Sequence, residues 1–247
     1  MSARWPWPRV IAHRGGGRLA PENTLAAIRK GHALGFRGVE FDVMLSADAV
    51  PVLIHDETLE RTTGGRGAVA ETQSDALAML DAGSWFSPAY AGEAVPRFDA
   101  AARLCASLRL WANVEIKPAQ GHERETGRCA ARVAAEAWAD APVALAPLLS
   151  SFQTAALETA REAAPQLARG LLFDAVPPDW RAQLEALACV SLHCNQEKLD
   201  EGLARAVREA GYGLAVWTVN DPDIARRLFS WGVDAIFTDR LDLIAPA

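Results

Sequence analysis

The feature that most constrains the fold is a regular alternation of short apolar runs with longer amphipathic stretches. The apolar runs are strand candidates, and they lie at Val10–His13, Gly38–Leu45, Val50–His55, Trp111–Ile116, Leu145–Ser150, Ala168–Phe173, Cys189–His193, Leu214–Thr218 and Ala235–Thr238. Helix candidates lie between them, at Asn23–Leu34, Phe98–Ser107, Glu125–Ala139, Thr154–Ala163, Trp180–Leu187, Leu199–Ala210 and Asp221–Trp231. Such an alternation predicts a parallel sheet with helical crossovers.

Counted without Val50–His55, the candidates give about eight strand–helix units, the number that closes a TIM barrel, also called a (β/α)8 barrel. A doubly wound open sheet is the alternative, but it usually has fewer strands and a G-x-G-x-x-G loop after the first one. The glycines at 15–17 do not have that spacing. We therefore predict an α/β fold, a TIM barrel that forms a single domain over residues 1–247.

The segment at about 57–96 interrupts the alternation. A structureless loop of this length is uncommon in a compact domain. We interpret it as a small inserted subdomain that follows the second barrel strand and caps one end of the barrel. A helix is expected within it, around Ser74–Leu80.

Charge and hydropathy exclude several classes of protein. The formal net charge is −6, which argues against a general nucleic-acid binder, since these are normally basic. An anionic substrate is still compatible, because a metal ion or local cations can reverse the sign inside a cleft. No run of about 18 apolar residues occurs, so no membrane span is expected.

The amino-terminal segment and the cysteines favour a cytoplasmic location. The segment has no apolar stretch long enough for a signal peptide, and Pro6 and Pro8 interrupt it. The cysteines form no C-x-x-C pair and are expected to be reduced and mostly buried; they are Cys105, Cys129, Cys189 and Cys194.

The first strand ends in Ile11-Ala12-His13-Arg14 and is followed by glycines. Active sites of TIM barrels lie at the carboxyl ends of the strands, so His13 and Arg14 are candidate site residues. A capping histidine and a surface arginine are the alternative. The next segment, Pro21-Glu22-Asn23-Thr24, opens a helix, and its side chains are expected to cap that helix or to brace the site.

The second strand carries Glu40 and Asp42, which are two residues apart and therefore point to the same face. Two carboxylates inside a barrel repel one another and are costly to bury. A divalent cation removes both problems, and oxygen ligands suit Mg²⁺ or Ca²⁺. Salt bridges to lysine or arginine are the alternative.

A turn centred near Asp48 would send the next apolar run back, antiparallel to the second strand. Position 55 then returns opposite position 41. His55, with Asp56 beside it, would thus come within reach of Glu40 and Asp42.

The third barrel strand carries Glu115 and Lys117 on one face. Glu115 would add a third carboxylate to the metal, and Lys117 would bring a positive charge to a substrate oxyanion. Ion pairs of these two residues with each other, or with Asp42 and Glu40, are the alternative. Trp217 lies where an aromatic ring can pack on an organic substrate group or on the barrel rim. His193 could line the mouth of the barrel, but we favour its interpretation as a satisfied core histidine.

The chain resembles the glycerophosphodiester phosphodiesterases, with the cytoplasmic bacterial members as the closest likeness. The matching segments run in the family's order over almost the whole chain; they are His13-Arg14-Gly15, Pro21-Glu22-Asn23-Thr24, Val39-Glu40-Phe41-Asp42-Val43, His55–Gly64, Glu115-Ile116-Lys117-Pro118, Trp217-Thr218-Val219-Asn220 and Gly232-Val233-Asp234. The resemblance implies release of glycerol 3-phosphate and an alcohol from glycerophosphodiesters. It also implies that Glu40, Asp42 and Glu115 bind the metal and that His13 and His55 are the general acid and base.

The expected reaction leaves some alternatives open. Arg14 and Lys117 would neutralise charge on the phosphoryl oxygens, and the nucleophile is either the 2-hydroxyl of the substrate or water. The leaving alcohol, the order of acid and base, and the oligomeric state are not readable from the sequence. A phosphodiesterase that acts on lysophospholipids, like a lysophospholipase D, is the competing enzyme. A barrel that binds phosphodiesters without turnover would be expected to lack a histidine or carboxylate of this set.

Overall fold

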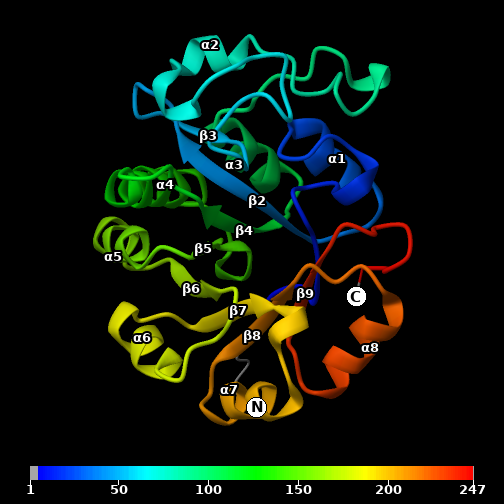
Figure 1. Ribbon diagram of the computed structural model, residues 1–247, viewed down its shortest axis with the longest axis vertical. Coiled ribbons are helices and arrows are strands. Elements are labelled where there is room, and N and C mark those ends of the chain that lie inside the picture. Colours follow the sequence, from blue (N-terminus) through cyan, green and yellow to red (C-terminus); the bar gives the residue numbers. More distant parts are fainter. Residues whose placement is uncertain (1–4, 247) are drawn as a thin grey trace.

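Parallel strands close into a barrel in the computed structural model of the chain, which describes residues 5–246 (Figure 1). The barrel strands are β1 (Val10–Ala12), β2 (Gly38–Leu45), β4 (Trp111–Ile116), β5 (Leu148–Ser151), β6 (Ala168–Phe173), β7 (Ser191–Asn195), β8 (Gly213–Trp217) and β9 (Ala235–Thr238). The ring closes because β1 pairs in parallel with both β2 and β9. The prediction of a TIM barrel is confirmed.

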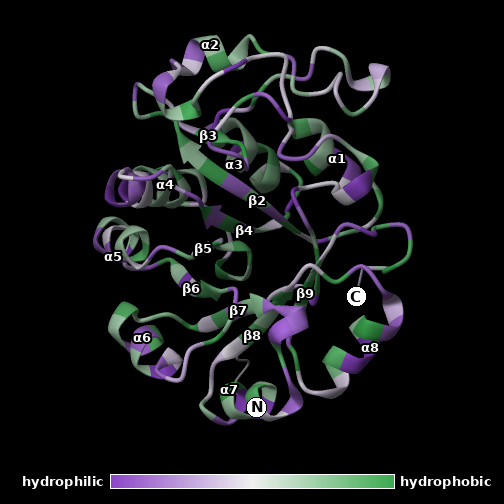
Figure 2. Ribbon diagram, in the orientation of Figure 1, coloured by the Kyte–Doolittle hydropathy of each residue, from purple (hydrophilic) through white to green (hydrophobic). Residues whose placement is uncertain are grey.

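Helices form the outer layer around the barrel (Figure 1). They are α1 (Leu25–Ala33), α3 (Phe98–Ser107), α4 (Glu123–Ala137), α5 (Thr154–Ala163), α6 (Trp180–Leu187), α7 (Glu201–Glu209) and α8 (Pro222–Ser230). Each presents apolar residues to the sheet and polar residues outward, which Figure 2 shows as mixed green and purple ribbons. Thr24 is the N-cap of α1, and its hydroxyl accepts a hydrogen bond from the Ala27 amide at 3.1 Å.

The start of β5 differs more from the sequence prediction than the start of any other strand described. The run Leu145–Ser150 was expected to be extended, but Val143–Leu145 form a 3-10 turn and β5 begins at Leu148. Pro147 precedes that residue and has no N–H to donate to a neighbouring strand, so the ladder starts after it.

The hairpin after β2 has the predicted geometry. Strand β3 (Pro51–Leu53) runs antiparallel to β2, with Val43 opposite Leu53 and Leu45 opposite Pro51. The Ile54 amide also donates to the Asp42 carbonyl at 3.2 Å. This register brings His55 opposite Phe41, so the histidine returns to the carboxyl end of the barrel.

Residues 57–96, here called the cap, follow the hairpin and lie at one end of the molecule, at the top of Figure 1. They contain two 3-10 turns, Val69–Glu71 and Pro88–Tyr90, and the short helix α2 (Ser74–Ala78). Several cap residues pack with β2 and the hairpin in a small apolar cluster of their own, which includes Met44, Val52, Ile54, Leu59, Val69, Leu77 and Val95. The cap therefore has its own packed interior.

The amino-terminal end of the barrel is filled by apolar side chains. Trp111 and Phe237 lie in one interior cluster with Trp5 and Trp7 packed against it. Trp7 stacks on Trp111 with ring centroids 5.4 Å apart. The cavity described below lies toward the opposite, carboxyl end, and Phe237 belongs to its wall as well. Among the helices within residues 5–246, none is long and apolar enough to cross a membrane.

Candidate active site

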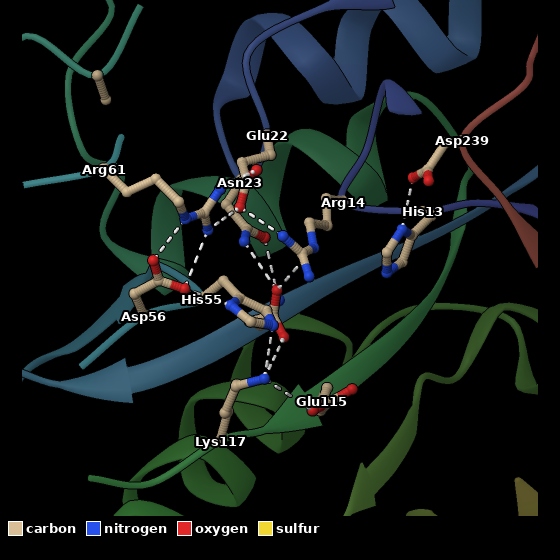
Figure 3. Close-up of polar contacts among 12 residues, drawn as sticks. His13, Arg14, Glu22, Asn23, His55, Asp56, Arg61, Glu115, Lys117 and Asp239 are labelled. Atoms are coloured by element: carbon tan, nitrogen blue, oxygen red, sulfur yellow. Dashed lines mark hydrogen bonds and ion pairs between the residues drawn. The ribbon is translucent and has the colours of Figure 1, made fainter. Parts of the chain in front are cut away.

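A cavity of about 280 Å³ opens at the carboxyl ends of the barrel strands. Its walls carry every residue that the sequence analysis assigned to the site, namely His13, Arg14, Glu40, Asp42, His55, Glu115, Lys117 and Trp217. They come from β2, β4, β8 and the loops that follow β1, β3 and β4, and Figure 3 shows most of them converging. The barrel thus brings together side chains that are far apart in sequence.

Three carboxylates form a cluster in this cavity. Glu40 and Asp42 project from β2, and Glu115 lies on β4 directly beside Asp42 in the parallel register. One oxygen from each lies within 4.8 Å of the other two. Burial, with the charge of Asp42 nearby, raises the pKa of Glu40 well above its usual value and that of Glu115 to about 8.

The cluster fits a divalent cation. Glu40 Oε1 is buried and has no hydrogen-bond partner within residues 5–246, and a buried carboxylate oxygen needs a proton, a donor or a cation. The raised pKa values of Glu40 and Glu115 show how unfavourable three ionised carboxylates are here without a positive charge. An all-oxygen donor set is the kind that Mg²⁺ and Ca²⁺ prefer.

Asp42 is held in its ionised form. Burial alone would raise its pKa, but the positive charges of Arg14 and Lys117 and a hydrogen bond from Asn23 bring the pKa below its usual value. The Asn23 side chain donates to Asp42 Oδ2 at 2.8 Å and accepts from the Asp42 amide at 3.0 Å. Asn23 therefore braces a candidate metal ligand, while the next residue, Thr24, caps the helix.

His13 is oriented by a carboxylate from the other end of the chain. Its Nδ1 lies 2.7 Å from Asp239 Oδ1, and its Nε2 lies 3.8 Å from Glu40 Oε2. Asn220 holds Asp239 in place by donating to Oδ2 and accepting from the Asp239 amide. The loop after β1 comes close to Asp239, since a Cβ at Gly17 would lie 2.3 Å from the Asp239 carbonyl oxygen. This approach requires a glycine.

His55 has a partner on each ring nitrogen. Nδ1 lies 2.6 Å from Asp56 Oδ1, and Lys117 Nζ lies 2.7 Å from Nε2. Because a lysine ammonium can only donate, Nε2 is the acceptor and Nδ1 carries the proton. Burial, opposed by Asp42 and reinforced by the charges of Arg14 and Lys117, lowers the pKa of His55 below its ordinary value. The ring is therefore neutral at pH 7.

Arg14 connects the cavity to the cap. Its amide donates to Glu40 Oε2 at 2.8 Å, and its guanidinium donates to Glu22 at 2.6 Å. Arg61, from the cap, binds the same Glu22 through two nitrogens and also donates to Asp56 (Figure 3). An ion network thus runs from the cap residue Arg61 to both Arg14 and the partner of His55.

The sequence analysis assigned no role in the site to three residues that contribute to it. Asp239 directly follows the last barrel strand, and nothing local in the sequence shows that it reaches His13. Asn113 and His193 also line the cavity. The favoured interpretation of His193 as a satisfied core histidine is correct about its burial but wrong about its hydrogen bonds, because its Nδ1 has no partner among the described residues.

A second hollow of about 450 Å³ adjoins the cavity on the side of the cap. His13, Arg14 and Thr218 line both spaces. Arg18 and the cap residues Trp85 and Phe86 line only the second one. His13 thus lies between the carboxylate cluster and an open, partly aromatic recess.

Comparison with known proteins places the chain in a family. A family model described as the glycerophosphoryl diester phosphodiesterase family matches residues 13–243. A glycerophosphodiester phosphodiesterase of Caldanaerobacter subterraneus is 34% identical over 236 residues, which cover 93% of each chain. A putative glycerophosphodiester phosphodiesterase of Bacillus subtilis, YhdW, is 31% identical, with 95% of this chain and 96% of the relative covered.

Comparison with solved structures places the chain in the same family. A phosphodiesterase of Oleispira antarctica, in complex with the product sn-glycerol-3-phosphate, matches with a TM-score of 0.90 and 39% identity, covering 94% of this chain and 93% of that one. A glycerophosphodiester phosphodiesterase of Agrobacterium tumefaciens matches with a TM-score of 0.78 and 30% identity, covering 95% and 97%.

The fold, the cavity and these likenesses together define a hydrolase of phosphodiesters built on a TIM barrel. Within that class, the chain belongs to the glycerophosphodiester phosphodiesterase family.

Proposed function

We propose that the chain hydrolyses glycerophosphodiesters to sn-glycerol 3-phosphate and an alcohol, with one bound Mg²⁺ or Ca²⁺ and two histidines acting in proton transfer. The observation that carries the proposal is the cavity in which Glu40, Asp42 and Glu115 lie beside His13 and His55. The Oleispira relative, which holds sn-glycerol-3-phosphate, supports the choice of product.

Glu40, Asp42 and Glu115 would hold the cation. When bound, it would polarise a phosphate oxygen and offset the negative charge of the substrate and of the three carboxylates. Arg14 lies at the edge of this cluster, with Nε 3.6 Å from Asp42 Oδ2, and Lys117 Nζ lies within 4 Å of Asp42 and Glu115. Both cations would neutralise the phosphoryl oxygens as charge builds on them.

His55 suits the general base, because its ring is neutral and its lone pair points into the cavity toward Lys117. Substrate phosphate would draw the Lys117 ammonium away from Nε2 and free that nitrogen to accept the proton of the nucleophile. Asp56 would hold the Nδ1–H of the resulting imidazolium. Lys117 therefore has two successive partners, the histidine before binding and the phosphate after it.

His13 suits the general acid, because it lines both the cavity and the hollow beneath the cap. Asp239 fixes Nδ1 and leaves Nε2 facing the ligand space. As the bond from phosphorus to the leaving oxygen breaks, His13 would give that oxygen its proton, and the alcohol would depart through the hollow. Trp85 and Phe86 would then contact the leaving alcohol, and Trp217 the glycerol part.

The nucleophile is either the substrate's 2-hydroxyl or water. Attack by the 2-hydroxyl gives a cyclic phosphate, and water then opens it; direct attack by water gives glycerol 3-phosphate in one step. Quenched reactions separated by ³¹P NMR distinguish the two, since only the first produces a cyclic phosphodiester signal that rises and decays.

The direct test measures release of sn-glycerol 3-phosphate from a panel of glycerophosphodiesters, and of its acylated form, lysophosphatidic acid, from one lysophospholipid, with and without chelator. Activity on the glycerophosphodiesters that disappears in EDTA and returns with Mg²⁺ or Ca²⁺ supports the proposal. Full activity in EDTA contradicts metal dependence. Activity restricted to the lysophospholipid identifies the competing enzyme.

We also propose a cytoplasmic location, on the basis of the four free thiols at Cys105, Cys129, Cys189 and Cys194. Burial raises the pKa of Cys105, Cys189 and Cys194 to about 12, so these thiols stay protonated and unreactive. Cell fractionation with an antibody to the chain tests this location, and recovery outside the cytoplasm contradicts it.

A further inference from the structure

Two buried polar atoms at the inner end of the cavity lack a partner. Asn113 is 1% exposed and its Oδ1 has no hydrogen bond, and His193 is 0% exposed and its Nδ1 has none, within residues 5–246. Both side chains line the cavity that holds the carboxylate cluster. A buried polar atom without a hydrogen bond is destabilising, so this pair of atoms indicates a missing ligand group.

A serine holds each of the two side chains in place. Asn113 Nδ2 donates to Ser150 Oγ at 2.9 Å, which leaves the amide oxygen as the available atom. His193 Nε2 lies 3.0 Å from Ser191 Oγ, which leaves Nδ1. Asn113 on β4 and His193 on β7 line the same cavity, so two side chains, each with one unpartnered polar atom, approach it from different walls.

The neighbouring backbone makes room for the histidine. A Cβ at Gly170 on β6 would lie 2.8 Å from His193 Nε2 and 2.7 Å from Ser191 Oγ. The His193 ring also packs near Phe237 and Trp5, with ring centroids 5.6 and 5.9 Å away. The ring is thus enclosed on several sides and cannot turn its free nitrogen toward bulk water.

The position of the pair fits one end of the proposed substrate. Asn113 precedes Glu115 by two residues on the same face of β4 and pairs in register with Glu40, so it lies one layer deeper than the outer carboxylates. Leu172, Phe237 and Trp217 supply apolar walls around it. A ligand whose phosphate lies at the carboxylate cluster can therefore extend a short carbon chain inward, toward two neutral polar atoms.

We propose that Asn113 and His193 bind the terminal hydroxyl of the glycerol part, a recognition that rests on the proposed glycerophosphodiesterase function. The amide oxygen of Asn113 accepts a hydrogen bond from the hydroxyl, and the Nδ1–H of His193 donates one to the hydroxyl oxygen. This hydroxyl is the one farthest from phosphorus, so it reaches the deepest point. The glycerol end therefore enters first, and the leaving alcohol faces the cap.

A hydroxyl suits this pair better than a charged group does. Burial lowers the pKa of His193 to about 3, so the ring is neutral and offers either a donor or an acceptor. A hydroxyl can serve both, whereas an ammonium only donates and a carboxylate only accepts. The inner end would consequently disfavour an ethanolamine ammonium, which can only donate, and the trimethylammonium of choline, which has no N–H and makes no hydrogen bond, and would bind the polyol.

The test compares sn-glycero-3-phosphocholine with the analogue in which the terminal hydroxyl is replaced by hydrogen and the 2-hydroxyl is kept. In the wild-type chain, we expect kcat/KM to fall by about 10–100-fold for the analogue, because the two buried atoms lose their partner. Asn113→Leu and His193→Phe should lower kcat/KM for the natural substrate by a similar factor and leave the analogue nearly unaffected.

Asn195→Ala is the matched control, because Asn195 lies on β7 but donates to Asp174 outside the cavity. Calorimetric binding of sn-glycerol 3-phosphate and of inorganic phosphate adds a measurement that needs no turnover. Asn113→Leu and His193→Phe should each weaken the binding of sn-glycerol 3-phosphate by about 10-fold or more and leave the binding of inorganic phosphate unchanged.

Equal turnover of the two substrates by the wild-type chain would mean that water alone satisfies these atoms, and would overturn the proposal. Equal losses on both substrates in the two variants, or weaker phosphate binding, would overturn it as well. A variant that fails to fold is replaced by Asn113→Ala or His193→Leu. A wild-type chain that releases choline from neither substrate contradicts the proposed function itself.

Discussion

Lys117 Nζ lies 2.7 Å from His55 Nε2, so the ammonium donates to the nitrogen that would act as the base. The charge of Lys117 is one of the factors that lower the pKa of His55, after burial and the charge of Arg14. If His55 must be neutral, kcat/KM falls only as the pH drops through this lowered pKa, below the ordinary histidine value.

Lys117→Met should shift this acidic fall of kcat/KM, the acid limb of the pH profile, to higher pH. Removing a positive charge makes protonation of His55 easier, so its pKa rises and activity is lost at a higher pH than in the wild-type chain. Profiles of kcat/KM against pH for both chains, with NMR titration of the His55 ring, measure the shift. A limb that stays in place would show that another group controls it.

Loss of either histidine should lower kcat by about 10²–10⁴-fold, the usual contribution of a general acid or base. His13→Ala and His55→Ala should leave the binding of sn-glycerol 3-phosphate nearly unchanged, because neither ring is expected to hold the phosphate. His122→Ala, outside the cavity, is the control. Near-normal turnover in either variant would remove that histidine from the mechanism.

The grouping of site residues that lie close together in the sequence could be predicted, because it follows from local patterns. The two-residue period of a strand puts Glu40 with Asp42 and Glu115 with Lys117. The turn near Asp48 fixes the register that returns His55 to them. These inferences need only strand periodicity and the rule that barrel sites lie at the carboxyl ends of strands.

The contacts across the barrel could not be predicted from local patterns. His13 and Asp239 are separated by 226 residues and meet only because β1 pairs with β9. Whether His193 is satisfied depends on which atoms lie near Nδ1 inside the closed barrel, and no sequence period carries that information. Arg61 reaches Glu22 through the packing of the cap, which the sequence showed only as an interruption of the alternation.

Metal binding should stabilise the fold through the carboxylate cluster. A ligand at about 100 times its Kd adds about 2.7 kcal/mol, which corresponds to roughly 5–10 °C in Tm for a domain of this size. Differential scanning fluorimetry of EDTA-treated chain with added Mg²⁺ or Ca²⁺ measures it. Glu115→Gln should lose most of the shift, whereas Asp140→Asn, at an exposed site, should keep it. An equal shift in both variants would place the cation elsewhere.

Asn23 should control metal affinity without touching the metal. It fixes Asp42 through two hydrogen bonds, and loss of such an outer contact typically costs about 10–100-fold in affinity. Its backbone has φ of 58°, which glycine adopts more easily than alanine. Asn23→Gly and Asn23→Ala should therefore weaken metal binding alike in calorimetry, while Asn23→Ala unfolds at a lower temperature. Wild-type affinity in both would show that Asp42 needs no brace.

Arg61 should act as the link between the cap and the catalytic groups. Its guanidinium donates to Glu22, which holds Arg14, and to Asp56, which holds His55. Arg61→Ala should lower kcat/KM by about 10–100-fold, since charge-assisted hydrogen bonds contribute about 1.5–3 kcal/mol each and part of that orients the site. Arg61→Lys should recover only part of the loss, because an ammonium cannot reproduce the paired contacts of a guanidinium. Arg66→Ala changes an exposed arginine of the same cap and should leave kcat/KM unchanged. Full activity in Arg61→Ala, or an equal loss in Arg66→Ala, would show that the cap influences the reaction by some route other than this network.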